Sequence, residues 1–193
     1  MMKKLNPGKN RITRIAGICG ILLPIVVFMC IGFAMSHSPW FRLTKHALSD
    51  LGVEGIPAIF FNSGMILGGI LILVFSIGLI KILSNKTGAY ILSLSSLALI
   101  GIGVFPETGY ALHFIVSTAF FALLTISLLF IGLTIKQDRF ERNMGMLATL
   151  FAILAICSTA LIVPWEGIAI PESLSCFPAF IWCMMYGVKM TFE

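Results

Sequence analysis

Residues 15–35, IAGICGILLPIVVFMCIGFAM, form an almost entirely apolar run near the start of the chain. As a helix, a run of this length crosses the roughly 30 Å hydrocarbon core of a bilayer. A cleaved signal peptide has a shorter apolar core of about 7–15 residues, so we interpret the run as a retained transmembrane helix. The whole chain agrees with this interpretation, because its mean hydropathy is +1.04 and only 11% of its residues are charged.

The stretch that follows, residues 38–52 (SPWFRLTKHALSDLG), is polar enough to lie outside the hydrocarbon. Ser38 can cap a helix, Pro39 suits the first helical position, and Gly52 suits the residue after the end. Its apolar residues, Trp40 and Phe41 among them, fall on one side at helical spacing. The pattern predicts a short amphipathic helix that lies in the membrane interface between the first two transmembrane helices.

Five further apolar runs follow, joined by short polar turns. They predict helices over about residues 58–80, 89–104, 110–135, 144–163 and 174–188. With the first run, they predict an all-α, polytopic membrane protein built as a six-helix transmembrane bundle. We expect residues 1–14 to be a basic tail and residues 15–193 to form one transmembrane domain. Gly64 and Gly68 form a GxxxG pattern, which favours close approach of a neighbouring helix.

The cationic residues are distributed unevenly between the two ends of the predicted helices. Eleven of the thirteen Lys and Arg residues lie in the N-terminal tail, the 81–88 turn, the 136–143 loop and the C-terminal tail, and the other two are Arg42 and Lys45. By the positive-inside rule, we expect both termini to be cytoplasmic and the protein to be a multi-pass protein of the plasma membrane. The same placement explains the net charge of +5 without a nucleic-acid partner.

The opposite, extracytoplasmic end then holds every histidine and five of the eight acidic residues. An unpaired charge close to the hydrocarbon is costly, so we expect Asp50 and His113 to have partners and to lie within hydrogen-bond or one-water reach of each other. We expect Glu166 and Glu172 to be solvated loop residues. The predicted ligand-binding residues are Ser49, Asp50, Asn62, Glu107 and His113.

The order of these short motifs resembles a known family. Ser-Asp-Leu-Gly at 49–52 is followed by Asn62 early in the next helix, by the Phe-Pro turn at 105–106 and by His113 at the start of another helix. This order resembles the prokaryotic membrane proteins grouped as Domain of Unknown Function 998. The resemblance covers nearly the whole chain and implies a six-helix membrane protein, and it implies no activity.

Several functions fit this polar end, and the sequence leaves the choice open, including whether the protein is an enzyme. The first is binding of a lipid, a small ligand or a partner protein. The second is a hydrolase of lipid headgroups, either with zinc held by His46, Asp50, Glu107 and His113, or with an Asp50–His113 base and Ser49 as nucleophile. The third is a small-molecule transporter, although the helix centres lack the ionisable groups typical of ion-coupled carriers. In a purely structural role, His113 would pair with Asp50 and hold the interfacial helix in place.

The sequence gives no oligomeric state, and membrane lipid is the one partner that the composition predicts. The absence of HExxH and GxSxG patterns counts against the known hydrolase classes that carry them.

Overall fold

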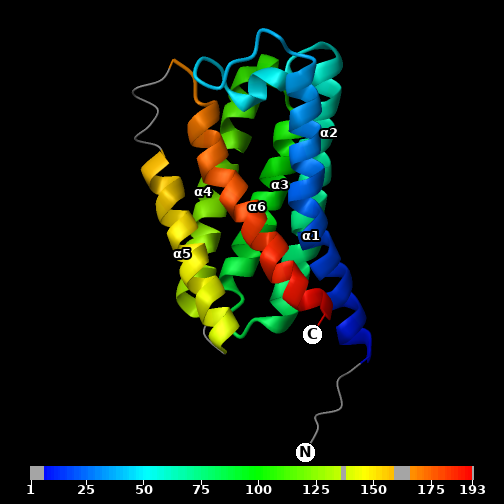
Figure 1. Cartoon of the computed structure of the whole chain (residues 1–193), viewed down its shortest axis with the longest axis vertical. Helices are drawn as coiled ribbons and strands as arrows, with labels where there is room; N and C mark the ends of the chain where they lie inside the picture. Colours follow the sequence, from blue (N-terminus) through cyan, green and yellow to red (C-terminus); the bar gives the residue numbers. More distant parts are fainter. Residues whose placement is uncertain (1–6, 136–137, 159–165, 193) are drawn as a thin grey trace, which may run out of the picture.

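The computed structural model describes the backbone of residues 7–135, 138–158 and 166–192, with side chains from residue 11 onward within these ranges. The described chain is all-helical, and Figure 1 shows its long helices side by side as an elongated bundle. The helices are α1 (Pro7–Ser36), α2 (Gly55–Ile82), α3 (Thr87–Val104), α4 (Tyr110–Thr134), α5 (Arg139–Ser158) and α6 (Ala169–Phe192). The described chain also contains two short 3-10 helices, η1 (Leu48–Gly52) and η2 (Glu107–Gly109). The predicted all-α, six-helix bundle is confirmed.

Five segments of the described chain are long and apolar enough to cross a membrane: Arg11–Ser36, Gly55–Ile82, Thr87–Val104, Glu107–Thr134 and Arg139–Ser158. The sixth helix, α6, is not among these five segments, and it contains Glu172 in its first turn and Lys189 in its last. Many large apolar side chains on the outside of the bundle are exposed, as expected of surfaces that face lipid. These features are those of a multi-pass membrane protein.

Some helix ends differ from the predicted ones. The first helix begins at Pro7 rather than near residue 15, so the last part of the predicted tail is helical, and α6 runs from Ala169 to Phe192 rather than over 174–188. Hydropathy marks only the segment within lipid, whereas helical hydrogen bonds continue into the polar interface. The predicted end of the fifth helix at residue 163 lies outside the described residues.

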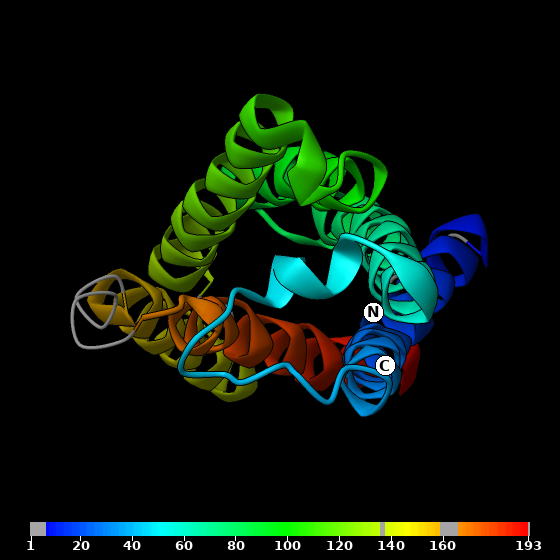
Figure 2. The same cartoon turned by 90° about the horizontal axis from the view of Figure 1, so that it is seen from above.

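The six helices form a closed ring in which each packs against the next and α6 packs against α1 (Figure 2). Glycines permit the close contacts. A methyl group on Gly17 would lie 2.7 Å from the Gly187 carbonyl oxygen, where α1 meets α6. One on Gly64 would lie 2.5 Å from Cys30 Cβ, and one on Gly68 would lie 2.6 Å from a methyl of Val27. The predicted GxxxG contact is therefore present, between α2 and α1.

The stretch over residues 38–52, which we call the cap, differs from its prediction. It is helical only over Leu48–Gly52, and the residues before it form turns. In a continuous helix the His46 carbonyl would accept a hydrogen bond from Asp50 N, but here it accepts one from Ala169 N at 2.9 Å. The Thr44 carbonyl likewise accepts from Gly167 N at 3.1 Å. Backbone bonds to the start of α6 thus replace those of the predicted helix.

The cap closes one end of the bundle, which we call the capped end. Figure 2 shows the cyan turn of η1 over the middle of the ring of helices. The described chain begins and ends at the opposite end, where α1 starts and α6 finishes (Figure 1).

Candidate functional site

Three carboxylates from three separate elements meet beneath the cap, and we call them the carboxylate cluster. Asp50 lies in η1, Glu107 in η2 and Glu172 in the first turn of α6. The Glu107 carboxyl interacts with the side chains of Asp50, Ser49 and His113. The Glu172 carboxylate lies close enough to Glu107 and Asp50 to be repelled by both. Burial, and after it the mutual repulsion of the carboxylates, disfavours full ionisation of the cluster, which therefore favours a bound proton or a hydrogen-bond donor.

Two of these carboxylates also hold the cap in place. Asp50 Oδ2 accepts a hydrogen bond from Ala47 N at 3.0 Å, which closes the first turn of η1. Glu172 Oε2 accepts one from Leu48 N at 2.6 Å, which joins the cap to α6. Glu107 Oε2, in contrast, is buried and accepts no hydrogen bond within the described residues.

His113 lies in the first turn of α4, interacts with Glu107 of this cluster and is only 7% exposed. Its Nδ1 lies 2.8 Å from the Phe105 carbonyl oxygen, and its Nε2 lies 3.2 Å from Ser117 Oγ. Because a carbonyl oxygen can only accept, Nδ1 carries a ring hydrogen, and in the neutral ring Nε2 then accepts from the Ser117 hydroxyl. The hydrogen bonds of the two ring nitrogens therefore go to Phe105 and Ser117 and not to Asp50. Glu107 is the carboxylate that interacts with both Asp50 and His113.

Asn62 joins the end of the cap to α2. Its Nδ2 donates a hydrogen bond to the Gly52 carbonyl oxygen at 3.0 Å. A methyl group on Gly52 would lie only 2.6 Å from Asn62 Oδ1, so this contact requires glycine. Asn62 thus positions η1 above the bundle.

A cavity of about 40 Å³ lies directly beneath the cap. Side chains from α1, α2, α3, α4, α6 and η1 line it. Most of the wall is apolar, including Val27, Leu99, Phe120, Phe177 and Phe180. Its polar side chains are Ser49, Ser117 and Glu172. At about 10–15 Å³ for each water, the volume corresponds to about three water molecules or a short apolar group.

The structure therefore brings together four of the five predicted binding residues, Ser49, Asp50, Glu107 and His113, and places Asn62 as a support. The expectation that Glu172 is a solvated loop residue is wrong. Glu172 shares a helix face with the buried residues Cys176, Ala179 and Cys183, and this spacing is a signal that hydropathy alone does not reveal. Ser117 was not predicted, because a single serine in a transmembrane helix usually bonds its own backbone.

The proposed zinc ligands do not all meet. The His46 ring packs against Trp40 and Phe41, and its Nδ1 accepts a hydrogen bond from Arg42 N at 3.0 Å. Across the ranges that the structure describes, no group of three or more His, Cys, Asp and Glu side chains is arranged to hold a metal ion.

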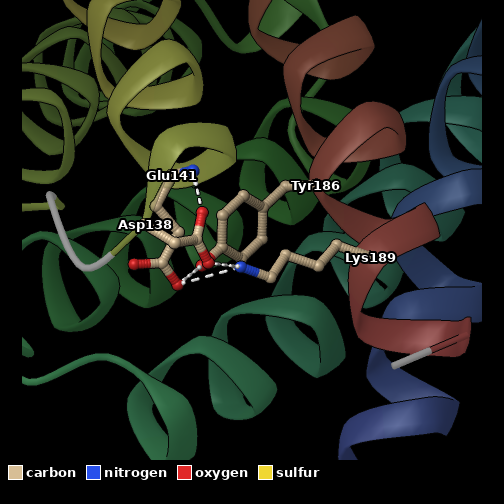
Figure 3. Close-up of polar contacts among 4 residues, drawn as sticks. All are labelled: Asp138, Glu141, Tyr186 and Lys189. Carbon is tan, nitrogen blue, oxygen red and sulfur yellow. Dashed lines mark hydrogen bonds and ion pairs between the residues drawn. The ribbon is translucent and has the colours of Figure 1, made fainter.

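A second polar cluster lies at the other end of the bundle, between α5 and α6 (Figure 3). Lys189 Nζ lies 2.7 Å from Asp138 Oδ2 and 3.3 Å from Glu141 Oε1, and Tyr186 donates a hydrogen bond to the same Glu141 oxygen. The ammonium of Lys189 holds the pKa of the Asp138 carboxyl below its usual value. The pairing of groups with opposite charge indicates that this cluster joins the two helices.

A family model described as "Protein of unknown function (DUF998)" matches residues 19–189 of the chain. A search of curated proteins found no match, and a search of solved structures found none either.

Proposed function

The chain belongs to the DUF998 family of proteins of unknown function, and we propose that it binds an amphipathic ligand, a lipid or a small molecule, beneath its cap. The observation that carries this proposal is the cavity, which has an apolar wall and a carboxylate from the cluster on its rim. An apolar wall with a few convergent polar groups is the usual lining of small-molecule sites, and at about 40 Å³ this cavity would hold a short apolar group. The apolar part of the ligand would fill the cavity, and its polar part would meet the carboxylate cluster.

The polar part of the ligand is a hydrogen-bond donor or a cation. Ionised carboxylates only accept hydrogen bonds, and Asp50, Glu107 and Glu172 face one another. Lys45, one of the two cationic residues near the capped end, is paired with Glu166 at 3.2 Å on the surface. An ammonium or a hydroxyl-rich group would therefore be favoured there over a phosphate or a sulfate.

We further propose that the capped end is extracytoplasmic. Eleven of the thirteen Lys and Arg residues belong to segments at the opposite end or leading to it. This distribution supports a plasma-membrane protein with both termini in the cytoplasm. The ligand would then reach the site from outside the cell or from the outer leaflet.

Binding can be tested with the purified protein in lipid nanodiscs. The probes are a short-chain alkylammonium and an alkyl sulfate with the same chain, each followed by calorimetry. We expect the ammonium to bind and the sulfate to bind at least tenfold more weakly. Cys176→Leu adds volume to the cavity wall and should weaken ammonium binding, whereas Cys157→Leu, at an exposed position, should not.

The charge requirement has its own pair of variants. Glu107→Gln removes a cluster charge without changing its shape, and we expect it to weaken ammonium binding. Glu54→Gln alters an exposed acid near the same end and should leave binding unchanged. Equal affinity for the two probes, or binding that is insensitive to Cys176→Leu, would contradict the proposal.

A further inference from the structure

A serine of the cavity wall contacts a buried histidine that lies behind the wall, and the binding function does not require this contact. Ser117 lines the cavity, and its Oγ lies 3.2 Å from His113 Nε2. His113 is 7% exposed, and its other ring nitrogen lies 2.8 Å from the Phe105 carbonyl oxygen. A nucleophile, a base and a group that orients the base are the parts of covalent acyl-transfer sites.

The orientation of His113 is the one that a general base needs. The Phe105 carbonyl fixes the ring hydrogen on Nδ1, which leaves the lone pair of Nε2 directed at the Ser117 hydroxyl. This arrangement also differs from the common fate of a serine in a membrane helix, which is to bond the carbonyl one turn earlier. Thr125 and Thr134 of the same helix do so, at 2.8 Å and 2.6 Å.

The position of Ser117 suits a particular bond in an amphipathic ligand. Below it, Phe120 and Phe121 continue the apolar wall on the same helix, and above it His113 leads to Glu107 in the carboxylate cluster. In an amphiphile that is bound as proposed above, the link between the apolar part and the donor-rich part would lie at this level. An ester at that link would meet the Ser117 hydroxyl.

We propose that Ser117 is a nucleophile, with His113 as its base, that cleaves an ester of an amphipathic ligand held in the cavity. This inference rests on the proposed binding function. Ser117 Oγ would attack the acyl carbon and pass its proton to His113 Nε2, and the same proton would leave with the departing alcohol as the C–O bond of the ester breaks. Water would then release the acyl group, giving one proton to Nε2 and restoring the Ser117 hydroxyl.

The tetrahedral step also needs a hydrogen-bond donor for the oxyanion. Ser49 is the other hydroxyl among the residues that line the cavity. It comes from the cap, so a cap that closes over the ligand would bring this donor with it. The carboxylate cluster would bind the leaving part of the ligand, which carries the donors.

The test is covalent labelling of the full-length protein in nanodiscs with a short-chain alkyl fluorophosphonate, read by intact-protein and peptide mass spectrometry. We expect one adduct, on Ser117. Ser117→Ala should abolish it, and His113→Gln should slow it at least about 100-fold, in line with the contribution of a general base. Thr118→Ala, which removes the neighbouring hydroxyl at an exposed position outside the cavity wall, should label as the wild type does.

Thermal unfolding of each variant shows whether it is folded, and alkylammonium binding shows whether the cavity is intact. A folded wild type that binds the alkylammonium but gives no Ser117 adduct would overturn this inference and leave the binding function standing. Labelling of Ser117 at the same rate in folded His113→Gln would also overturn it. A wild-type protein that binds the alkylammonium no more tightly than the alkyl sulfate would instead contradict the binding function.

Discussion

At the scale of single residues, Glu172 has two opposing effects on the cap. Its carboxylate accepts the hydrogen bond from Leu48 N, yet it lies near two other carboxylates. Glu172→Gln keeps an acceptor and cannot ionise, whereas Glu172→Ala leaves a partly buried backbone N–H without its partner. We expect the alanine variant to be less stable than the glutamine variant by about 1–2 kcal/mol.

This comparison is made by thermal unfolding of both variants in the same nanodiscs. Because both lack the charge, the difference between them isolates the hydrogen bond. Equal midpoints would show that the bond from Leu48 does not hold the cap to α6.

Lys189 of α6 forms ion pairs with the residues at the start of α5. Its side chain is 15% exposed and bridges Asp138 and Glu141, and the Glu141 side chain is only 9% exposed. Lys189→Met keeps much of the volume and removes the cation. Only the Glu141 end of this bridge is buried, so we expect a loss of about 1 kcal/mol in the free energy of unfolding, between the values of exposed and buried pairs.

The matched control is Lys81→Met, an exposed lysine in the last turn of α2 at the same end of the bundle. Its unfolding midpoint should stay within experimental error of the wild type. A Lys189→Met protein as stable as this control would show that the cluster in Figure 3 contributes little to stability.

At the scale of elements, the cap is held by backbone contacts that a side chain at Gly167 would break. A methyl group there would overlap the His46 amide nitrogen and the Lys45 carbonyl carbon. We expect Gly167→Ala to displace the cap from α6 and to expose its backbone. Trypsin should then cleave after Arg42 and Lys45 several-fold faster than in the wild type, as followed by gel and mass spectrometry.

Gly32→Ala provides the control for this element, because a methyl group at Gly32 meets nothing within 4 Å. Within helix α1 the substitution should be neutral or stabilise by about 0.5–1 kcal/mol. Cleavage of the cap at wild-type rate in Gly167→Ala would mean that the cap can shift without opening.

At the scale of the whole molecule, the distribution of cationic residues predicts which end of the bundle faces the cytoplasm. In a background without native cysteines, Lys45→Cys at the capped end should react with a membrane-impermeant maleimide in intact cells. Lys86→Cys, next to the start of α3 at the other end, should react only after the membrane is opened. The reverse pattern would place the cavity and the carboxylate cluster on the cytoplasmic side.

The sequence by itself determined the number, type and approximate position of the membrane helices. Hydropathy and helical periodicity are local properties, and lipid leaves helices as the only structure that satisfies each backbone group within its own segment. Short motifs also marked Ser49, Asp50, Glu107 and His113. The cap was predicted less well, because the Thr44 and His46 carbonyls accept hydrogen bonds from residues after position 165, which no local pattern shows.

Only the tertiary structure decided which polar groups meet. Leu48 and Glu172 are 124 positions apart, and the closure of α6 against α1 brings them together. The contact of Ser117 with the His113 ring, rather than with its own backbone, likewise depends on the Phe105 carbonyl at the end of α3. Such contacts depend on how helices pack, and that packing is set by shape across the whole bundle and not by any one segment.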